Sequence, residues 1–277
     1  MLGYLFLTET YAPVLLSRRK IQLQQDEREL NGNMPTKSMY FIKDEDERSL
    51  PTKLRHSLRR PLVIFAQPIV MTMSIYQALL FGTTYSIYTN IEKIFSHEPY
   101  DFDSRQIGLL YLGPGLGFLT AIWFLVPKID VVYNRLTERN NGQELPEFRL
   151  PLANIGAVLI PASLFAFAWT VEYRLHWIIP TIATYFYGIG QEMIFITVQN
   201  YYIDSFREYA ASAIAAGSVF RSVVGGVVPL FAPMMFEKIG YGWGVSVFAF
   251  LSLLIAPSPI IFYYYGQRVR DRFQAHF

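Results

Sequence analysis

The chain contains no cysteine, few charged residues and only four histidines. Without cysteine it has no disulfides or thiolate-bound metals, and thiol catalysis is excluded. The histidines show no metal-ligand spacing, so neither a metal nor a cofactor is expected. The net charge of +2 is too small to indicate nucleic acid, and no basic run alternates with aromatic residues as single-strand binding requires.

Apolar residues make up 52% of the 277 residues and charged residues only 17%. A soluble domain would carry about a quarter charged residues. The apolar residues are gathered in blocks of about twenty or more, the length that spans a bilayer. These blocks are too long for barrel strands, so they predict an all-α polytopic membrane protein.

Six membrane helices are predicted within a transmembrane bundle over residues 61–266. The expected spans are 62–90, 106–127, 152–170, 177–203, 210–236 and 242–265. Basic residues concentrate in the loops on one side, which predicts that this side is cytosolic and that the segment 17–60 and the tail 267–277 lie there.

The segment 1–16 is apolar but is interrupted by Glu9 and has no cleavage site, so it does not fit a signal peptide. It is interpreted as the remnant of a preceding membrane helix, which predicts a truncated chain. Residues 17–60 are polar with mixed charge, and they are interpreted as a solvated linker.

Two ionisable residues interrupt long apolar segments, and each is costly in lipid. Glu192 lies twelve residues before Asp204, and Arg221 lies twelve residues after Tyr209. At the rise of an α-helix, each is therefore roughly 18 Å from the cytosolic end of its helix. We expect that they could pair, as part of a proton pathway or cation site. A structural tie between two helices is the alternative, as is an arginine that serves Asp204 or a backbone carbonyl.

A second candidate is an aromatic and polar face of the first span. Gln77 and Tyr85 belong to a set of positions at helical spacing, completed by 81, 84 and 88. Such a face could bind an amphiphilic cation, because aromatic rings attract cations. Asn200 and Tyr201 are similar candidates in the fourth span. Interhelical packing explains all of these positions as well.

Several motifs in order resemble the C-terminal half of a fungal major facilitator superfamily transporter of the drug:proton antiporter type. They include Arg60-Pro61-Leu62, Gly113-Pro114-Gly115-Leu116-Gly117, Pro146-Glu147-Phe148-Arg149-Leu150-Pro151, Phe167-Ala168-Trp169-Thr170, Pro229-Leu230-Phe231 and Tyr264-Tyr265-Gly266. One departure concerns the site: where the family commonly has Glu-Pro, this chain has Gln67-Pro68, so one acidic position is neutral.

The resemblance implies one half of the fold, a 3+3 inverted repeat, and a transporter of drug- or polyamine-like solutes by proton antiport with alternating access. It also places Asp130 and Arg135 in a loop motif that braces the cytosolic side. Asp204, in the hinge, could add a gating ion pair. The alternatives are that Arg135 is an ordinary basic residue of a cytosolic loop and that Asp204 caps a helix.

A half-fold would need a partner, either the missing N-terminal half or a second copy, besides the lipid bilayer, protons and the small-molecule substrate. The alternative function is a non-transporting half-protein that binds or regulates an intact transporter. An enzyme is not expected, since no catalytic set lies within the spans. The resemblance favours the plasma membrane, and a vacuolar membrane stays open.

Overall fold

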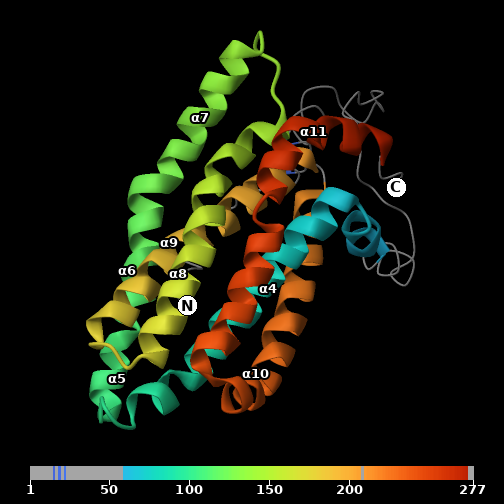
Figure 1. Cartoon of the computed structure of the whole chain (residues 1–277). Helices are drawn as coiled ribbons and strands as arrows, with labels where there is room; N and C mark the ends of the chain where they lie inside the picture. The colour runs from blue at the N-terminus through green and yellow to red at the C-terminus, as the bar shows by residue number, and fades with distance from the viewer. Residues whose placement is uncertain (1–14, 16–17, 20–21, 23–58, 207–208, 274–277) are drawn as a thin grey trace, which may run out of the picture. The chain divides into compact units, whose positions relative to one another are not determined.

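The computed structural model describes Leu15, Arg18, Arg19, Gln22, residues 59–206 and residues 209–273. Residue contacts divide the chain into Met1–Leu54 and Arg55–Phe277, and the helices below belong to the second unit. Its described part is helical and contains no strand (Figure 1). The all-α fold class is therefore confirmed, whereas the predicted segments 1–16 and 17–60 lie almost wholly outside the described residues.

The first predicted span is bent near its start. A short helix, Arg59–Phe65, meets α4, Pro68–Phe95, at an angle of 92°. Gln67 has extended backbone with ψ of 132°, as a residue before proline prefers. Pro68 then opens α4, where its missing N–H costs nothing. The prediction of one continuous helix over 62–90 is therefore wrong at Gln67.

The second span consists of several helices that follow one another directly. They are α5, Ser104–Leu110, α6, Leu112–Thr120, a π-helical turn, Ala121–Leu125, and α7, Val126–Arg139. Pro127 stands just after the π turn, which changes the hydrogen-bond spacing where a regular α-helix could not accept a proline. The helix therefore continues past its predicted end at Pro127 to Arg139.

The third and fourth predicted spans each correspond to a long helix. A 3₁₀ helix, Pro146–Leu152, leads into α8, Ala153–Glu172, and after a short loop comes α9, Ile178–Ser205. Glycines bring α8 and α9 close, because a Cβ on Gly190 would lie 2.9 Å from Ile160.

The last two predicted spans correspond to two helices whose boundaries differ from the predicted ones. Helix α10 covers Ala210–Ile255 but is kinked at Gly240, where φ is +78°, and α11 covers Ser258–Arg272. The kink falls in the predicted break between 236 and 242. A second break precedes Ser258, because Pro257 cannot continue α10, so the predicted helix over 242–265 is two helices.

Among the residues that the structure describes, three helical stretches are long and apolar enough to cross a membrane: Ser104–Arg139, Pro146–Glu172 and Ala210–Arg272, the last including the kink. The bent pair ending in α4 could be a fourth. Within the described residues α9 does not reach this level. The arrangement of six spans as a 3+3 half therefore stays a prediction.

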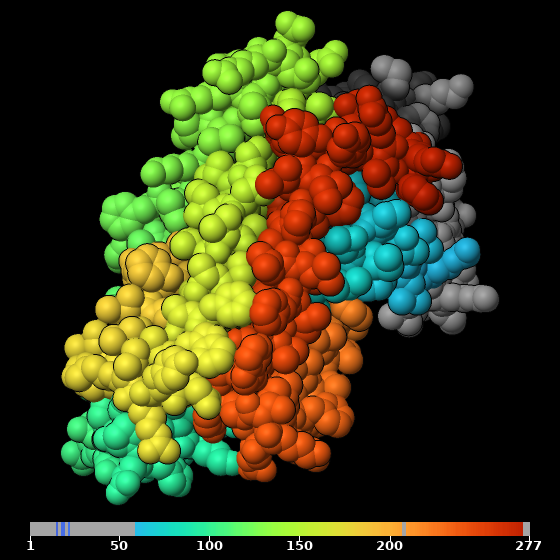
Figure 2. All heavy atoms as spheres, viewed as in Figure 1, coloured from blue at the N-terminus to red at the C-terminus, as the bar shows by residue number. Residues whose placement is uncertain are grey.

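Helix α4 lies along α10 and contacts α9, while α8 lies between α9 and α10 (Figure 1). The core between them is rich in aromatic side chains, with Tyr76, Phe167 and Tyr202 all under 3% exposed. Large apolar side chains also lie outward on α10, as expected for a lipid-facing helix: Val219, Val223, Val227, Leu230 and Phe231. Figure 2 shows α10 and α11 directly against α8.

The bundle has two ends, which we name by one residue each. The Arg149 end holds the end of α7, the 3₁₀ helix, the end of α9 and α11 (Figure 1). The Lys93 end holds the end of α4, α5, the end of α8 and the kink at Gly240.

Candidate functional site

Buried hydroxyl and amide groups join α4 to α9. The Oγ1 of Thr84 donates to Oε1 of Gln191 at 2.9 Å and lies 3.0 Å from the hydroxyl of Tyr187. Two to three helical turns away, Ser74 Oγ and the hydroxyl of Tyr202 are 2.9 Å apart. Because buried polar groups in an apolar helix need partners, these contacts fix the register of the two helices.

Gln77 is part of the same contact. It is 1% exposed, and its Nε2 donates a long hydrogen bond of 3.5 Å to the backbone oxygen of Phe195. The predicted aromatic face is thus split by the structure. Gln77 and Thr84 are buried between helices, whereas Tyr85 is 47% exposed.

Arg221 reaches from α10 to aromatic rings on two other helices. Its guanidinium carbon lies 4.8 Å from the ring centroid of Phe81 on α4 and 4.5 Å from that of Phe195 on α9. The two rings stack with centroids 5.8 Å apart, and Tyr85 lies 5.9 Å from Phe81. The Nε of Arg221 is buried and has no hydrogen-bond partner among the described residues. We name Arg221, Phe81, Phe195 and Tyr85 the arginine–aromatic site.

Glu192 does not pair with Arg221. The expected depth is consistent with the structure, since Arg221 contacts Phe195, three residues from Glu192. The faces differ, however. Gly188, one turn before Glu192 and so on the same face of α9, packs against Pro114 of α6. Glu192 is half-buried there, and it forms no ion pair with any described residue.

The other two predicted pathway residues, Tyr201 and Asn200, differ in burial. Tyr201 is 2% exposed and packs in the core, with its ring 6.3 Å from that of Tyr202. Asn200 is half-buried near the end of α9. Neither belongs to the arginine–aromatic site.

At the Arg149 end, one arginine joins two of the predicted gate residues. Arg149 Nε donates to Asp204 Oδ2 at 2.7 Å, and its NH1 forms a short ion pair with Asp130. The guanidinium carbon also lies 4.0 Å from the ring centroid of Tyr133. The 3₁₀ helix is thereby tied to α7 and α9. Arg135 is exposed on α7 and forms no ion pair with the described residues.

A second link starts from the same 3₁₀ helix. Glu147 is 2% exposed, and its Oε1 lies 3.2 Å from NH1 of Arg270 on α11. A Cβ on Gly266 would lie 2.7 Å from Glu147, so the glycine admits this carboxylate. The sequence interpretation did not select Arg149, Glu147 or Arg270 as site residues. The available signal was the pair of opposite charges in the segment Pro146–Leu152, which contains two prolines.

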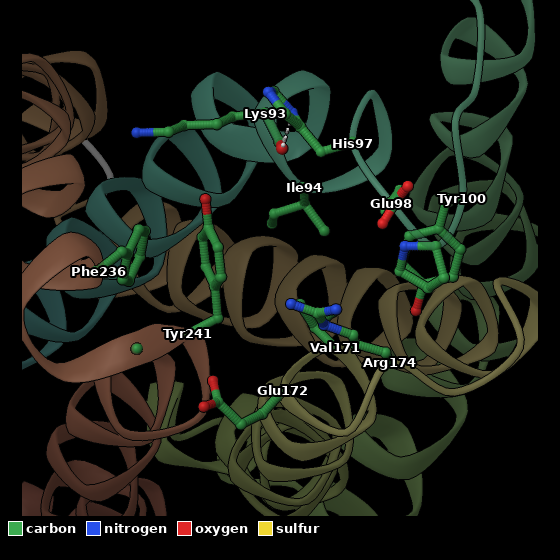
Figure 3. A pocket seen from close by; sticks show the side chains of 12 residues that line it. Lys93, Ile94, His97, Glu98, Tyr100, Val171, Glu172, Arg174, Phe236 and Tyr241 are labelled. Carbon is green, nitrogen blue, oxygen red and sulfur yellow. Dashed lines mark hydrogen bonds between the residues drawn. The ribbon is translucent and has the colours of Figure 1, made fainter.

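A cavity of about 350 Å³ lies at the Lys93 end (Figure 3). Lys93 lines it and forms an ion pair of 2.6 Å with Glu237, and Glu172, also in the lining, accepts the N–H of Gly242 at 2.8 Å. Partial burial raises the pKa of the Tyr100 phenol, which donates to the backbone oxygen of Leu175 at 2.6 Å. Its charged lining residues carry both signs and are solvent-exposed, whereas its apolar lining residues Ile94, Val171 and Phe236 are buried. The cavity is therefore an open polar entrance rather than an enclosed binding site.

Within the described residues, no group of three or more histidine, aspartate or glutamate side chains could hold a metal ion. The arginine–aromatic site provides a cation beside aromatic rings, and Glu192 provides a half-buried carboxylate in the middle of α9.

Residues 2–229 match the family described as Major Facilitator Superfamily. The chain is 38% identical over 273 residues to the MFS-type transporter penM of Penicillium rubens, covering 97% of this chain and 52% of penM. It is 35% identical over 274 residues to the MFS-type efflux pump MFS2 of Trichophyton rubrum, covering 98% of this chain and 44% of that protein. The chain spans about half the length of the curated relatives it matches. No solved structure matches it.

Proposed function

Because the chain belongs to the Major Facilitator Superfamily, we propose that it moves small organic solutes of the drug- or polyamine-like class across a membrane by proton antiport. The family consists of membrane transporters, so the chain is not an enzyme. Its long apolar helices make it an integral membrane protein. The observation that carries the transport proposal is the family match over residues 2–229, and the efflux-pump relative supports it.

Glu192 supports the antiport part of the proposal. It is a half-buried carboxylate in the middle of α9, about three turns before Asp204, and it has no cationic partner among the described residues. An ionisable group in such a position is costly and is retained where it serves a proton or ion pathway. We propose that Glu192 takes up and releases the coupled proton.

The ion pairs at the Arg149 end support a role in alternating access. Transporters of this kind move one half against the other as nearly rigid bodies. Arg149 with Asp130 and Asp204, and Glu147 with Arg270, would hold four helical elements together during that motion. We propose that this end faces the cytosol, in the plasma membrane, and that Arg135 joins the gate through the opposing half.

A mid-membrane site between two halves requires a second half. We propose that further residues or a second copy of the chain supply it, since the chain spans about half the length of its relatives.

Reconstituted vesicles test the proposal. The purified chain is placed in liposomes with an acidic lumen, and uptake of 2-naphthalenesulfonate and of 2-naphthylmethyl-trimethylammonium is measured in separate experiments. Both probes carry permanent charges, so passive leak does not follow pH. Uptake of either probe that depends on the protein and on the pH gradient is expected. Equal uptake in protein-free vesicles would reject transport by this chain.

The length relative to the curated relatives also favours a second candidate, a membrane partner of an intact transporter. In that case vesicles with this chain alone would show no protein-dependent uptake. Adding the chain to vesicles that hold an intact relative such as penM would change the uptake rate.

A further inference from the structure

The arginine–aromatic site contains a positive charge that no described side chain neutralises. The ion pairs that the structure describes join Lys93 to Glu237, Arg149 to two aspartates, and Arg270 to Glu147. None includes Arg221, and Glu192 belongs to another face of α9. A cation in apolar surroundings without a counter-charge is costly and strongly favours an approaching anion.

The rings of this site are already engaged by a cation. Phe81 and Phe195 both lie within 5 Å of the Arg221 guanidinium carbon. An organic cation would have to displace the guanidinium from these rings or approach it closely, and like charges repel. This differs from the sequence expectation, in which the aromatic face alone would attract a cation.

The same site offers what an anionic aromatic solute needs. Arg221 as a whole is only half-buried, so its side chain stays partly accessible, and a guanidinium makes strong hydrogen bonds with carboxylate and sulfonate oxygens. Tyr85, 47% exposed and packed 3.3 Å from the Cβ position of Gly225, provides an aromatic surface one turn along both helices.

We propose that the arginine–aromatic site binds the anionic group of an aromatic solute, and that the chain therefore selects organic anions over organic cations. The inference rests on the proposed function, because it names the substrate class of the same transporter. Within the drug- or polyamine-like class predicted from the sequence, it excludes the polyamine-like part.

Binding to the purified full chain in lipid nanodiscs tests this selection through naphthalene fluorescence. Three probes share one ring system: 2-naphthalenesulfonate, 2-naphthalenemethanol and 2-naphthylmethyl-trimethylammonium. The wild-type chain is expected to bind the anion roughly tenfold more tightly than the cation, which corresponds to about 1.4 kcal/mol. Equal binding of the two, or tighter binding of the cation, would overturn the proposal.

Substitution identifies the residue. Arg221→Gln is expected to remove the preference for the anion while it leaves the neutral alcohol unaffected. Arg105→Gln, at an exposed arginine of α5, is the matched control and should change nothing. An equal loss for all three probes in Arg221→Gln would contradict a charge-based role. Should that variant fail to fold, Arg221→Lys keeps the charge and should retain a weaker anion preference; loss of the preference there contradicts the proposal.

The vesicle assay separates this inference from the proposed function. Selective anion binding without any protein-dependent uptake would reject transport but keep the binding site. Uptake of the cationic probe alone would keep transport and reject the anion site.

Discussion

The Nε of Arg149 donates a 2.7 Å hydrogen bond to Oδ2 of Asp204, which ties the 3₁₀ helix to the last turn of α9. The side chains of Arg149 and Asp204 are 15% and 22% exposed, so water screens this pair only partly. The side chain of Asp130, on the other side of Arg149, is 71% exposed, and its ion pair contributes little.

We therefore expect Arg149→Ala to lower the free energy of unfolding by about 1.5–3 kcal/mol, the range for a hydrogen bond to a charged group. Chemical denaturation in detergent micelles measures the change. Arg135→Ala is the matched control, because Arg135 is exposed and has no ion pair with described residues. Equal effects of the two substitutions would contradict the assigned role of Arg149.

The pair of Glu147 and Arg270 is suited to a double-mutant cycle. Glu147 is 2% exposed, so removing Arg270 alone leaves a buried carboxylate without its partner. Glu147→Gln and Arg270→Gln should each destabilise the chain, and the double variant should lose less than their sum. Strict additivity, measured by the same denaturation, would show that the two side chains do not interact.

The hydrogen bond of Thr84 to Gln191 should contribute only modestly to stability. Interhelical hydrogen bonds in membrane proteins average about 0.6 kcal/mol, with a maximum of about 1.7. Thr84→Val is expected to cost an amount in this range. Thr72→Val is the control, because the Thr72 hydroxyl bonds within α4 to the backbone oxygen of Pro68. A larger loss at Thr72 than at Thr84 would contradict the interhelical role.

A methyl group at Gly188 should separate α9 from α6. The added Cβ would lie 2.6 Å from the backbone oxygen of Pro114, which cannot move as a flexible side chain could. Gly188→Ala is therefore expected to cost about 1–3 kcal/mol, as overpacking does. Gly115→Ala is the control, because no described atom lies within 4 Å of its Cβ position; it should be neutral or stabilising by up to about 1 kcal/mol. Destabilisation by both alike would argue against a close packing contact at Gly188.

Apolar block length was sufficient to predict the helices, but their breaks depended on local chemistry. Block length placed most long helices within a few residues. The bend at Gln67 depends on the residue before a proline, and the continuation past Pro127 depends on a π turn, which no apolar pattern encodes.

The depth of Arg221 and Glu192 along their helices was predictable from the sequence, but the helix faces on which the two residues lie were not. Counting residues predicted that Arg221 and Glu192 lie at the same level. In the structure Arg221 contacts Phe195, which is three residues from Glu192. Which face of α9 meets α10 is decided by packing, including the glycine contact of Gly188 with α6, and the sequence periodicity did not resolve it. Arg149 illustrates the same limit, since its two aspartate partners are distant in sequence and meet only when α7, the 3₁₀ helix and α9 are assembled.

Proton-coupled transport depends on Glu192, and the pH-gradient dependence of uptake in vesicles measures that coupling directly. Wild-type chain, Glu192→Gln and the exposed control Glu138→Gln are reconstituted in equal amounts, and uptake of 2-naphthalenesulfonate is recorded with and without an acidic lumen. The gradient is expected to stimulate uptake by the wild type and by Glu138→Gln but not by Glu192→Gln. Undiminished stimulation in Glu192→Gln would contradict a role of this carboxylate in proton coupling.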